Sequence, residues 1–169
     1  MCTFIHDSLS SLEGAAYERT AARGIIMRGS NILLLYTQRY NDYSFPGGGI
    51  DRNEDAVEAL LREIREETGA VNVRVLSEYG YIDEYRPHYK PEYDLMHMLS
   101  YFYICNADEQ LGDADLEDYE VANGMSAIWI NIHEAIAHNR EVIAAKEACM
   151  GLSIQRETWV MEQIVKDLL

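Results

Sequence analysis

The feature that most constrains this chain is a run of three glycines, Gly47 to Gly49, directly after Pro46. Both residue types disfavour the interior of helices and strands, glycine through its backbone freedom and proline through its missing N–H group. We therefore expect a loop over residues 39–49. Its backbone can adopt positive φ angles and approach a ligand closely.

The clearest helical pattern of the chain follows shortly after the glycines and covers residues 53–68. Asn53 is a suitable N-cap, and Glu54 and Asp55 would lie in the first turn, where the helix dipole favours negative charge. The spacing i, i+3, i+4, i+7 predicts one apolar face formed by Val57, Leu60, Leu61 and Ile64. Gly69 is suited to end the helix.

Apolar runs elsewhere in the chain predict strands over residues 21–27, 32–36, 71–76, 96–105 and 127–132. Between the third and fourth strands, residues 83–94 predict a loop or a hairpin tip, and the acidic stretch 107–120 predicts a loop. From residue 133 onward the chain is expected to be mainly helical, ending in an amphipathic helix over 158–169. Strands interleaved with helices predict an α/β or α+β layered domain.

The chain has 169 residues and a net charge of −15, which fits one acidic domain. Nucleic-acid binding needs a basic surface, and anionic membranes attract basic segments, so both partners are disfavoured. Cys2, Cys105 and Cys149 are odd in number and far apart, which argues against a disulfide framework or a zinc site. Without a signal peptide or a membrane-spanning apolar run, we expect a cytoplasmic protein.

Three glutamates, Glu63, Glu66 and Glu67, are spaced i, i+3 and i+4 on the predicted helix and form one patch beside its apolar face. Like charges at this spacing repel one another. A hard cation such as Mg²⁺ would relieve the repulsion, because carboxylate oxygens are its preferred ligands. The alternative is a solvated acidic face. The neighbouring glycine loop and Arg62 favour the cation.

Residues 48–70 as a whole resemble the Nudix box, G-x5-E-x7-R-E-U-x-E-E-x-G-U, in which U is a bulky aliphatic residue. The matching positions are Gly48, Glu54, Arg62-Glu63-Ile64, Glu66-Glu67 and Gly69. Only the last position departs, because Ala70 is small. The segment 44–47 before the box and Trp129 in a late strand also resemble this family. The resemblance therefore covers about residues 20–140.

The resemblance implies an α/β/α sandwich around a mixed central sheet. Residues 1–169 would form a single Nudix hydrolase domain, with 1–19 as an N-terminal extension and about 140–169 as a C-terminal helical part. The implied reaction is hydrolysis, dependent on Mg²⁺ or Mn²⁺, of a pyrophosphate bond in a small nucleotide, a nucleoside diphosphate linked to another moiety. A homodimer is expected from the habit of the family and from the aromatic residues of 83–103.

Matched to the box, the metal ligands of the family correspond to the carbonyl of Gly48 and the carboxylates of Glu63, Glu66 and Glu67. Arg62 and Glu54 resemble the pair that braces the helix and orients these carboxylates. The general base of the family is either the first glutamate of the run or a glutamate on a distant loop.

For this chain, the candidates for the base are therefore Glu63 within the box and Glu117 or Glu120 before the strand of Trp129. Arg39 ends a predicted strand just before the box, where a cation could reach a phosphate group. Tyr40 and Phe45 could stack on a base or form a pocket wall, with packing in the core as the alternative.

Substrate markers beyond the box do not agree with one another. Pro87 resembles a proline of the ADP-ribose subfamily, whereas Tyr85 and Tyr89 resemble a tyrosine of the diadenosine polyphosphate subfamily. An ADP-ribose-like nucleotide, a nucleotide sugar and a dinucleoside polyphosphate all remain open. The alternatives are a sanitising (d)NTP pyrophosphatase and a non-catalytic, nucleotide-sensing Nudix domain. The intact acidic positions of the box favour an enzyme.

Overall fold

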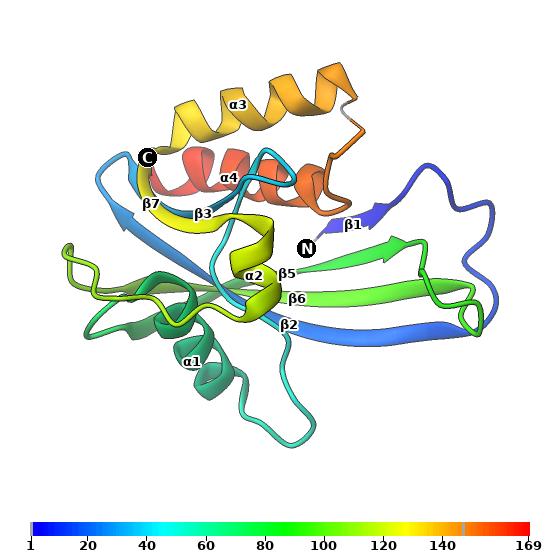
Figure 1. Ribbon diagram of the computed structural model, residues 1–169, viewed down its shortest axis with the longest axis horizontal. Helices are drawn as coiled ribbons and strands as arrows, with labels where there is room; N and C mark the ends of the chain where they lie inside the picture. The colour runs from blue at the N-terminus through cyan, green and yellow to red at the C-terminus, as the bar shows by residue number, and fades with distance from the viewer. Residues whose placement is uncertain (1, 147) are drawn as a thin grey trace.

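The computed structural model describes residues 2–146 and 148–169 (Figure 1). Its strands are β1 (Cys2–Ile5), β2 (Ala16–Arg28), β3 (Asn31–Thr37), β4 (Asp42–Ser44), β5 (Arg74–Arg86), β6 (Leu95–Asn106) and β7 (Met125–Asn131). Its helices are α1 (Ala56–Thr68), α2 (Asp118–Asn123), α3 (Ile132–Ala145) and α4 (Ile154–Leu168). Within these residues, none of the helices has the length and apolar character needed to cross a membrane.

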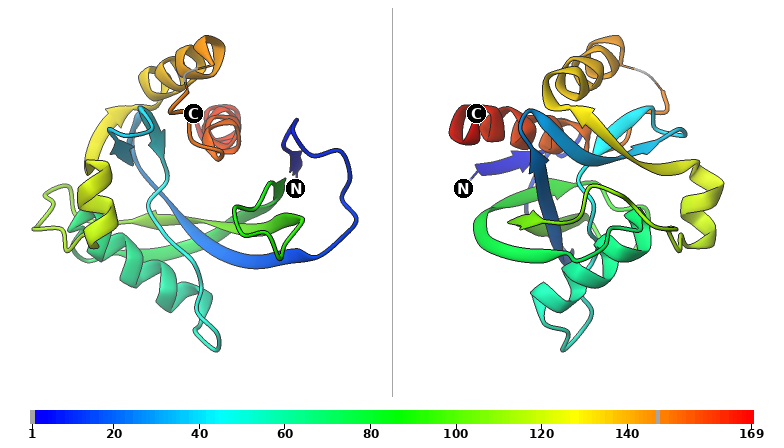
Figure 2. Two further views of the ribbon diagram at one scale, coloured as in Figure 1. Left: turned by 45° about the vertical axis from the view of Figure 1, so that its right-hand side comes forward. Right: turned by 90° about the vertical axis from the view of Figure 1, so that its left-hand side faces the viewer.

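Strand β2 joins the two halves of a mixed sheet. It pairs in parallel with β6 from Ala16 to Ile26 and pairs with β3 at Met27 and Arg28. β1 is parallel to β5, whereas β5 is antiparallel to β6, and β3 is antiparallel to β4 and β7. The strand order is β1-β5-β6-β2-β3-β4, with β7 beside β3. Figure 2 shows the two halves diverging beyond the β2–β3 turn.

The glycine loop lies along the edge of β2 that β3 leaves. The N–H group of Gly24 donates to the carbonyl of Pro46 at 2.9 Å, and that of Ala22 donates to the carbonyl of Gly48 at 3.0 Å. These bonds satisfy two backbone N–H groups of β2 that, among the described residues, have no partner in a neighbouring strand. They also fix the loop at the point where the halves of the sheet separate.

Helix α1 covers one face of the sheet, and α3 and α4 cover the other (Figures 1 and 2). On the α1 side the core includes Ala22, Ile26, Leu33, Leu60 and Ile64. On the opposite side it includes Ile25, Leu34, Phe102, Val160, Met161 and Ile164. Neighbouring residues of β2 enter different cores because side chains alternate across a strand. The α/β/α sandwich with a mixed central sheet is therefore confirmed.

Helix α1 begins later than the sequence pattern predicts. Its N-cap is Asp55, whose Oδ1 accepts hydrogen bonds from the N–H groups of Val57 at 2.9 Å and Glu58 at 3.2 Å. Asn53, the expected cap, instead has a left-handed conformation with φ 70°. Asparagine tolerates that conformation, so the residue shapes the loop before the helix. Gly69 ends the helix as predicted, with φ 66°.

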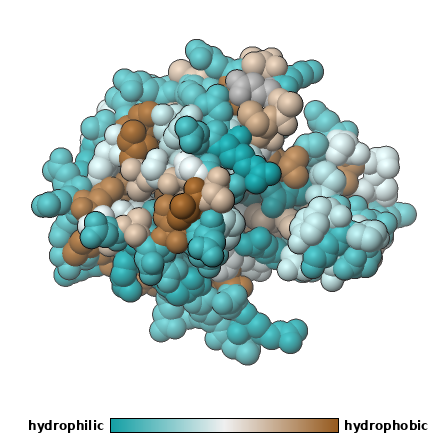
Figure 3. All heavy atoms as spheres, viewed as in Figure 1, coloured by the Kyte–Doolittle hydropathy of each residue, from teal (hydrophilic) through white to brown (hydrophobic). Residues whose placement is uncertain are grey.

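The segment that leads into α1 is a hydrophilic projection. Residues 51–53 are exposed, and the chain before α1 extends below the helix in Figure 1. The same projection is hydrophilic in the matching view of Figure 3. Because the segment is polar, it extends into solvent. It connects the glycine loop, which is bonded to β2, with helix α1, which packs on the sheet.

Other predicted boundaries change because strand pairing extends them. Residues 83–86, expected in a loop, belong to β5, which pairs with β6 as far as Arg86. The expected N-terminal extension, residues 1–19, partly enters the sheet, since β1 pairs with β5 and β2 begins at Ala16. The acidic stretch 107–120 ends in helix α2, which was not expected. The C-terminal helical part supplies core residues through α3 and α4.

Candidate active site

The glycine loop positions one carboxylate of helix α1 through its backbone. The N–H group of Gly47 donates to Oε2 of Glu67 at 2.6 Å, and the carbonyl of Gly47 accepts a hydrogen bond from Arg23 of β2. Gly47 has φ 125°, and a side chain there would collide with the backbone of Ala22. Only glycine fits this position, so the loop and Glu67 are held together.

The carboxylates of Glu63 and Glu67 are brought into this corner. Glu67 is only 6% exposed, and burial raises the pKa of its carboxyl to about 8 although Arg23 and the Gly47 N–H group oppose the shift. Burial also raises the pKa of Glu63, against the hydrogen bond from Arg62. A Cβ atom on Gly48 would lie 2.6 Å from Oε2 of Glu63. The absent side chain of Gly48 therefore leaves the space that the Glu63 carboxylate occupies.

Arg62 contacts three carboxylates at once. Its Nε and Nη2 atoms lie 3.1 and 3.2 Å from the two carboxylate oxygens of Glu54, and Nη1 lies 2.7 Å from Glu63 and 3.3 Å from Glu66. Its hydrogen bonds to Glu54 lead the effects that raise the pKa of Arg62, and they lower the pKa of Glu54. The two-pronged contact with Glu54 joins the loop before α1 to the middle of the helix.

Helix α2 provides the opposite wall. Glu120 is 6% exposed, and its carboxylate accepts hydrogen bonds from the Glu117 N–H group at 2.8 Å and from the Tyr119 hydroxyl at 3.0 Å. Glu117 itself is exposed. Both glutamates line the same cavity as Glu63 and Glu67, whose volume is about 450 Å³. The structure therefore brings the box and the distant acidic stretch together.

The donor set of this cavity consists of oxygens, which are the ligands that Mg²⁺ and Mn²⁺ prefer. Among residues 2–146 and 148–169, no group of three or more His, Cys, Asp or Glu side chains is already arranged to hold a metal ion. The contacts explain why, because Arg62 draws Glu63 and Glu66 while the Gly47 N–H group holds Glu67. The chemistry of these oxygen donors, gathered beside one cavity, fits a hard divalent cation.

The three residues predicted to contact the substrate have different positions. Tyr40 lines the cavity. Arg39 does not, because it binds Oδ1 of Asn123 at 3.0 Å and lies over the ring of Tyr40. Phe45 is fully buried, and its ring packs edge-to-face on Phe102 with centroids 5.4 Å apart. The prediction of substrate contact is therefore wrong for Phe45, which is a core residue, and Arg39 instead ties α2 to the turn after β3.

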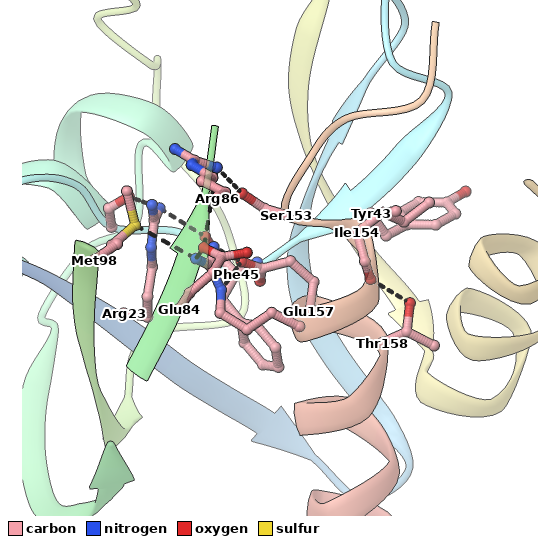
Figure 4. A network of polar contacts seen from close by, with 12 residues as sticks. Arg23, Tyr43, Phe45, Glu84, Arg86, Met98, Ser153, Ile154, Glu157 and Thr158 are labelled. Carbon is pink, nitrogen blue, oxygen red and sulfur yellow. Dashed lines mark hydrogen bonds and ion pairs between the residues drawn. The ribbon is translucent and has the colours of Figure 1, made fainter. Parts of the chain in front are cut away.

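The structure adds arginines that the sequence analysis missed. Arg19 and Arg23 of β2 line the cavity, and both also line a second cavity of about 510 Å³ together with Arg86 of β5 and Arg156 of α4. Arg23 stands between the small and apolar residues 21–22 and 24–27 of β2, and a charged residue in such a run is a sequence signal for a buried functional group. Figure 4 shows Arg23, Arg86, Glu84 and Glu157 gathered between the sheet and α4.

A buried network organises this second region. Arg156 is 1% exposed, and its Nη atoms lie 2.5 Å from Oε2 of Glu84 and 2.5 Å from Oε1 of Glu157. Burial alone lowers the pKa of Arg156, but Glu157 and Glu84 overcome this effect and raise it. Glu157 also accepts the N–H group of Phe45 at 3.0 Å. The network therefore joins α4 to β5 and to the start of the glycine loop.

Curated relatives match a short segment of the chain. RNA pyrophosphohydrolase of Campylobacter jejuni subsp. doylei is 49% identical over 39 residues, which are 23% of this chain and 25% of that protein. RNA pyrophosphohydrolase of Nitratiruptor sp. is 44% identical over 39 residues, with the same shares. The chain thus spans about a quarter of the length of the curated relatives it matches.

Solved structures match most of the chain. A NUDIX hydrolase from Nitrosomonas europaea has a TM-score of 0.58 and 18% identity, and the match covers 89% of this chain and 91% of that one. The MutT protein from Bacillus halodurans has a TM-score of 0.56 and 17% identity, with 87% and 82% covered. At these identities the likeness shows the shared fold.

A family model provides the assignment. The model described as the NUDIX domain matches residues 18–149, which include the glycine loop, all of α1, the acidic stretch and α2. The match agrees with the box at residues 48–70 and with the fold of the solved structures. The chain therefore belongs to the Nudix family.

Proposed function

We propose that this chain hydrolyses a pyrophosphate bond in a nucleoside diphosphate linked to another moiety. The observation that carries the proposal is the cavity in which Glu63 and Glu67 of α1 meet Glu120 of α2 beside the glycine loop. Membership of the Nudix family supports it, as do curated relatives named RNA pyrophosphohydrolase. Because those matches are short, the 5′ end of an RNA is one candidate substrate among several.

The proposed metal ligands are Glu63, Glu66, Glu67 and the carbonyl of Gly48. When bound, Mg²⁺ or Mn²⁺ would screen the phosphate oxygens and lower the pKa of a water molecule. The contacts of Arg62 with Glu54, Glu63 and Glu66 support a positioning role for Arg62 and Glu54. Such partners orient ligands and strengthen metal sites.

We propose Glu120 as the acceptor of the proton from the attacking water, with Glu63 as the alternative. Glu63 is held by Arg62 at 2.7 Å, whereas the described contacts of Glu120 are with neutral donors. Tyr40, on the wall of the cavity, is proposed to contact the substrate. The pH dependence of kcat for Glu120→Gln and Glu63→Gln separates the two, because loss of the base removes the acidic limb of the profile.

The decisive experiment is Glu67→Gln. Glutamine can still accept the Gly47 hydrogen bond and cannot ionise where burial disfavours charge, so thermal unfolding without metal should occur at the same or a higher temperature. Turnover with Mg²⁺ should fall by orders of magnitude because a metal ligand is lost. Glu58→Gln, on the exposed face of the same helix, is the matched control. Equal turnover in the Glu67 variant and the wild type would contradict the proposal.

A panel of substrates identifies the linked moiety and tests the remaining predictions. It contains ADP-ribose, a nucleotide sugar, a dinucleoside polyphosphate, dNTPs and a 5′-triphosphorylated RNA, each with and without Mg²⁺. Hydrolysis of dNTPs alone would favour the sanitising alternative. Silence across the panel, with Mg²⁺ still raising the melting temperature, would favour a nucleotide-sensing domain. Light scattering on the same samples tests the proposed homodimer.

A further inference from the structure

The proposed catalytic cavity continues into the second cavity described above. The two share the lining residues Arg19, Arg23, Thr37, Tyr40 and Ser44, so they form one cleft with two ends. The catalytic end holds Glu63, Glu67, Glu117 and Glu120. The other end, which we call the arginine end, is lined by Arg19, Arg23, Arg86 and Arg156.

The positive charge of the arginine end exceeds what its carboxylates neutralise. Glu84 and Glu157 contact Arg156, and Glu84 lies 4.0 Å from Arg86. In the ion pairs formed between described residues, neither Arg19 nor Arg23 takes part. Asp42 also lines this end, so four guanidinium groups lie near three carboxylates, and two of the four, Arg19 and Arg23, also line the catalytic end. In a protein of net charge −15, such a cluster of arginines is suited to bind an anionic ligand.

The arginines also repel one another. Burial is the main cause that lowers the pKa of Arg86; the charge of Glu84 opposes it, and the charges of Arg156, Arg19 and Arg23 lower it further. Burial also leads the effects that lower the pKa of Arg23; Arg156 and Arg19 add to it, whereas Glu157 and Glu67 oppose it. The Nε atom of Arg23 is buried without a hydrogen-bond partner among the described residues. An unpaired buried donor is costly, and a phosphate oxygen is the strongest acceptor for a guanidinium group.

We propose that the arginine end binds phosphate groups of the substrate that are not cleaved, so that the preferred substrates carry three or more linked phosphates. The inference rests on the proposed function, because it takes the carboxylate end as the place of cleavage. A diphosphate could reach Arg19 and Arg23 from the catalytic end, which they also line, but it would leave Arg86, which lines the arginine end alone, without an anion. A longer polyphosphate chain runs from the carboxylates, past Tyr40, to the arginines.

The rim of the arginine end suits the base of the same nucleotide. His88 and Tyr89 line it, with their rings stacked at 4.7 Å between centroids, and Tyr89 is 83% exposed. A purine stacks on such a ring without needing specific hydrogen bonds. Phosphates would then lie inside the cleft and a base at its mouth, which is the order in a nucleoside polyphosphate.

Binding is tested first without catalysis, using inorganic tripolyphosphate in EDTA at low salt and isothermal calorimetry. Arg19 is exposed and in none of the described ion pairs, so Arg19→Gln should fold normally. We expect about tenfold weaker binding, because hydrogen bonds to charged groups are strong. The affinity of Arg19→Lys for tripolyphosphate should lie between those of the wild type and Arg19→Gln, since lysine keeps the charge but not the planar guanidinium group. Arg74→Gln, an exposed arginine outside the cleft, is the matched control.

Catalysis is tested next with Mg²⁺ on diadenosine tetraphosphate and ADP-ribose. The wild type should prefer the tetraphosphate, and Arg19→Gln should lower kcat/KM for it about tenfold more than for ADP-ribose. Suppose that the wild type hydrolyses both substrates without preference and that Arg19→Gln leaves kcat/KM unchanged. This result would overturn phosphate binding at the arginine end and uphold the proposed function. Tripolyphosphate binding that depends on Arg19, without hydrolysis of any substrate, would uphold the arginine end and overturn the proposed function.

Discussion

Two arginine-centred networks flank the cleft, and they differ in burial. Arg62 on α1 contacts Glu54, Glu63 and Glu66, and its side chain is 38% exposed. Arg156 on α4 contacts Glu84 and Glu157, and its side chain is 1% exposed. A half-exposed network can exchange partners with water, so its carboxylates can turn toward a cation. A buried network cannot, and it serves to hold elements together.

The largest expected effect on stability is at Arg156, in the buried network. Arg156→Met leaves Glu84 and Glu157 buried without their cation, so we expect the free energy of unfolding to fall by about 3–5 kcal/mol. Chemical denaturation at neutral pH measures the loss. The triple variant Arg156→Met, Glu84→Gln, Glu157→Gln should recover part of it, because the two carboxylates are then neutral, although Arg86 loses its contact with Glu84. A single variant as stable as the wild type would show that the network does not hold α4.

Arg62 should show the opposite balance between activity and stability. We expect Arg62→Gln to lower kcat/KM by about 10- to 100-fold and to raise the Mg²⁺ concentration needed for half-maximal rate, because the glutamates lose their positioning partner. Thermal melting without metal should hardly change, since exposed ion pairs contribute little. Arg65→Gln, exposed on the same helix, is the control. A large loss of stability would make the two networks alike.

Asp42 is a buried carboxyl group near Glu157, and its effect on stability should depend on pH. Burial, with a smaller effect of Glu157, raises the pKa of Asp42 to about 6. Between its ordinary value and about 6, the folded state binds more protons than the unfolded chain, so stability falls as pH rises through this window. Asp42→Asn should therefore be more stable than the wild type by about 2 kcal/mol at pH 8 and about equal at pH 4. Denaturation at both pH values, with exposed Asp113→Asn as control, measures the difference.

The smallest effect is expected at a third network, which is built on a histidine. His97 lies 2.6 Å from Glu18 and 3.0 Å from Asp83. Burial lowers the pKa of His97, but the hydrogen bonds to Asp83 and Glu18 overcome it, and the net shift is upward. The stabilisation is present below the unfolded pKa and lost as pH rises through the folded one. His97→Gln should lose under about 1 kcal/mol at pH 5.5 and less at pH 8.5 or in high salt.

The same contrast explains what could be predicted from the sequence. Arg62 and its partners lie within one loop and one helix, so their spacing predicts the patch that the structure contains. Arg156 and Glu84 are 72 residues apart, and only the packing of α4 on β5 joins them. For Phe45 the sequence leaves both a pocket wall and the core open, because an aromatic residue beside a glycine loop fits either. Its burial against Phe102 depends on β6, which is distant in sequence.

The fold follows the same rule. Alternating apolar runs and the periodicity of α1 predict the layers, because each pattern is local. The entry of β1 into the sheet could not be read from its own residues, since it depends on the parallel partner β5. Helix α1 begins at Ala56 because Asp55, which the sequence places in the first turn, is also a good N-cap residue and accepts the N–H groups of Val57 and Glu58.

The glycine loop is held in place by backbone hydrogen bonds from strand β2. Because Ala22 and Gly24 donate their N–H groups to the carbonyls of Gly48 and Pro46, the loop cannot open without exposing these two amides to solvent. Amide hydrogen exchange at Ala22 and Gly24 would therefore follow the opening of the loop, while neighbouring β2 amides bonded to β6 would follow the opening of the sheet. Exchange at these two backbone amides thus reports how often the loop beside the proposed active site opens, although neither residue has a proposed catalytic side chain.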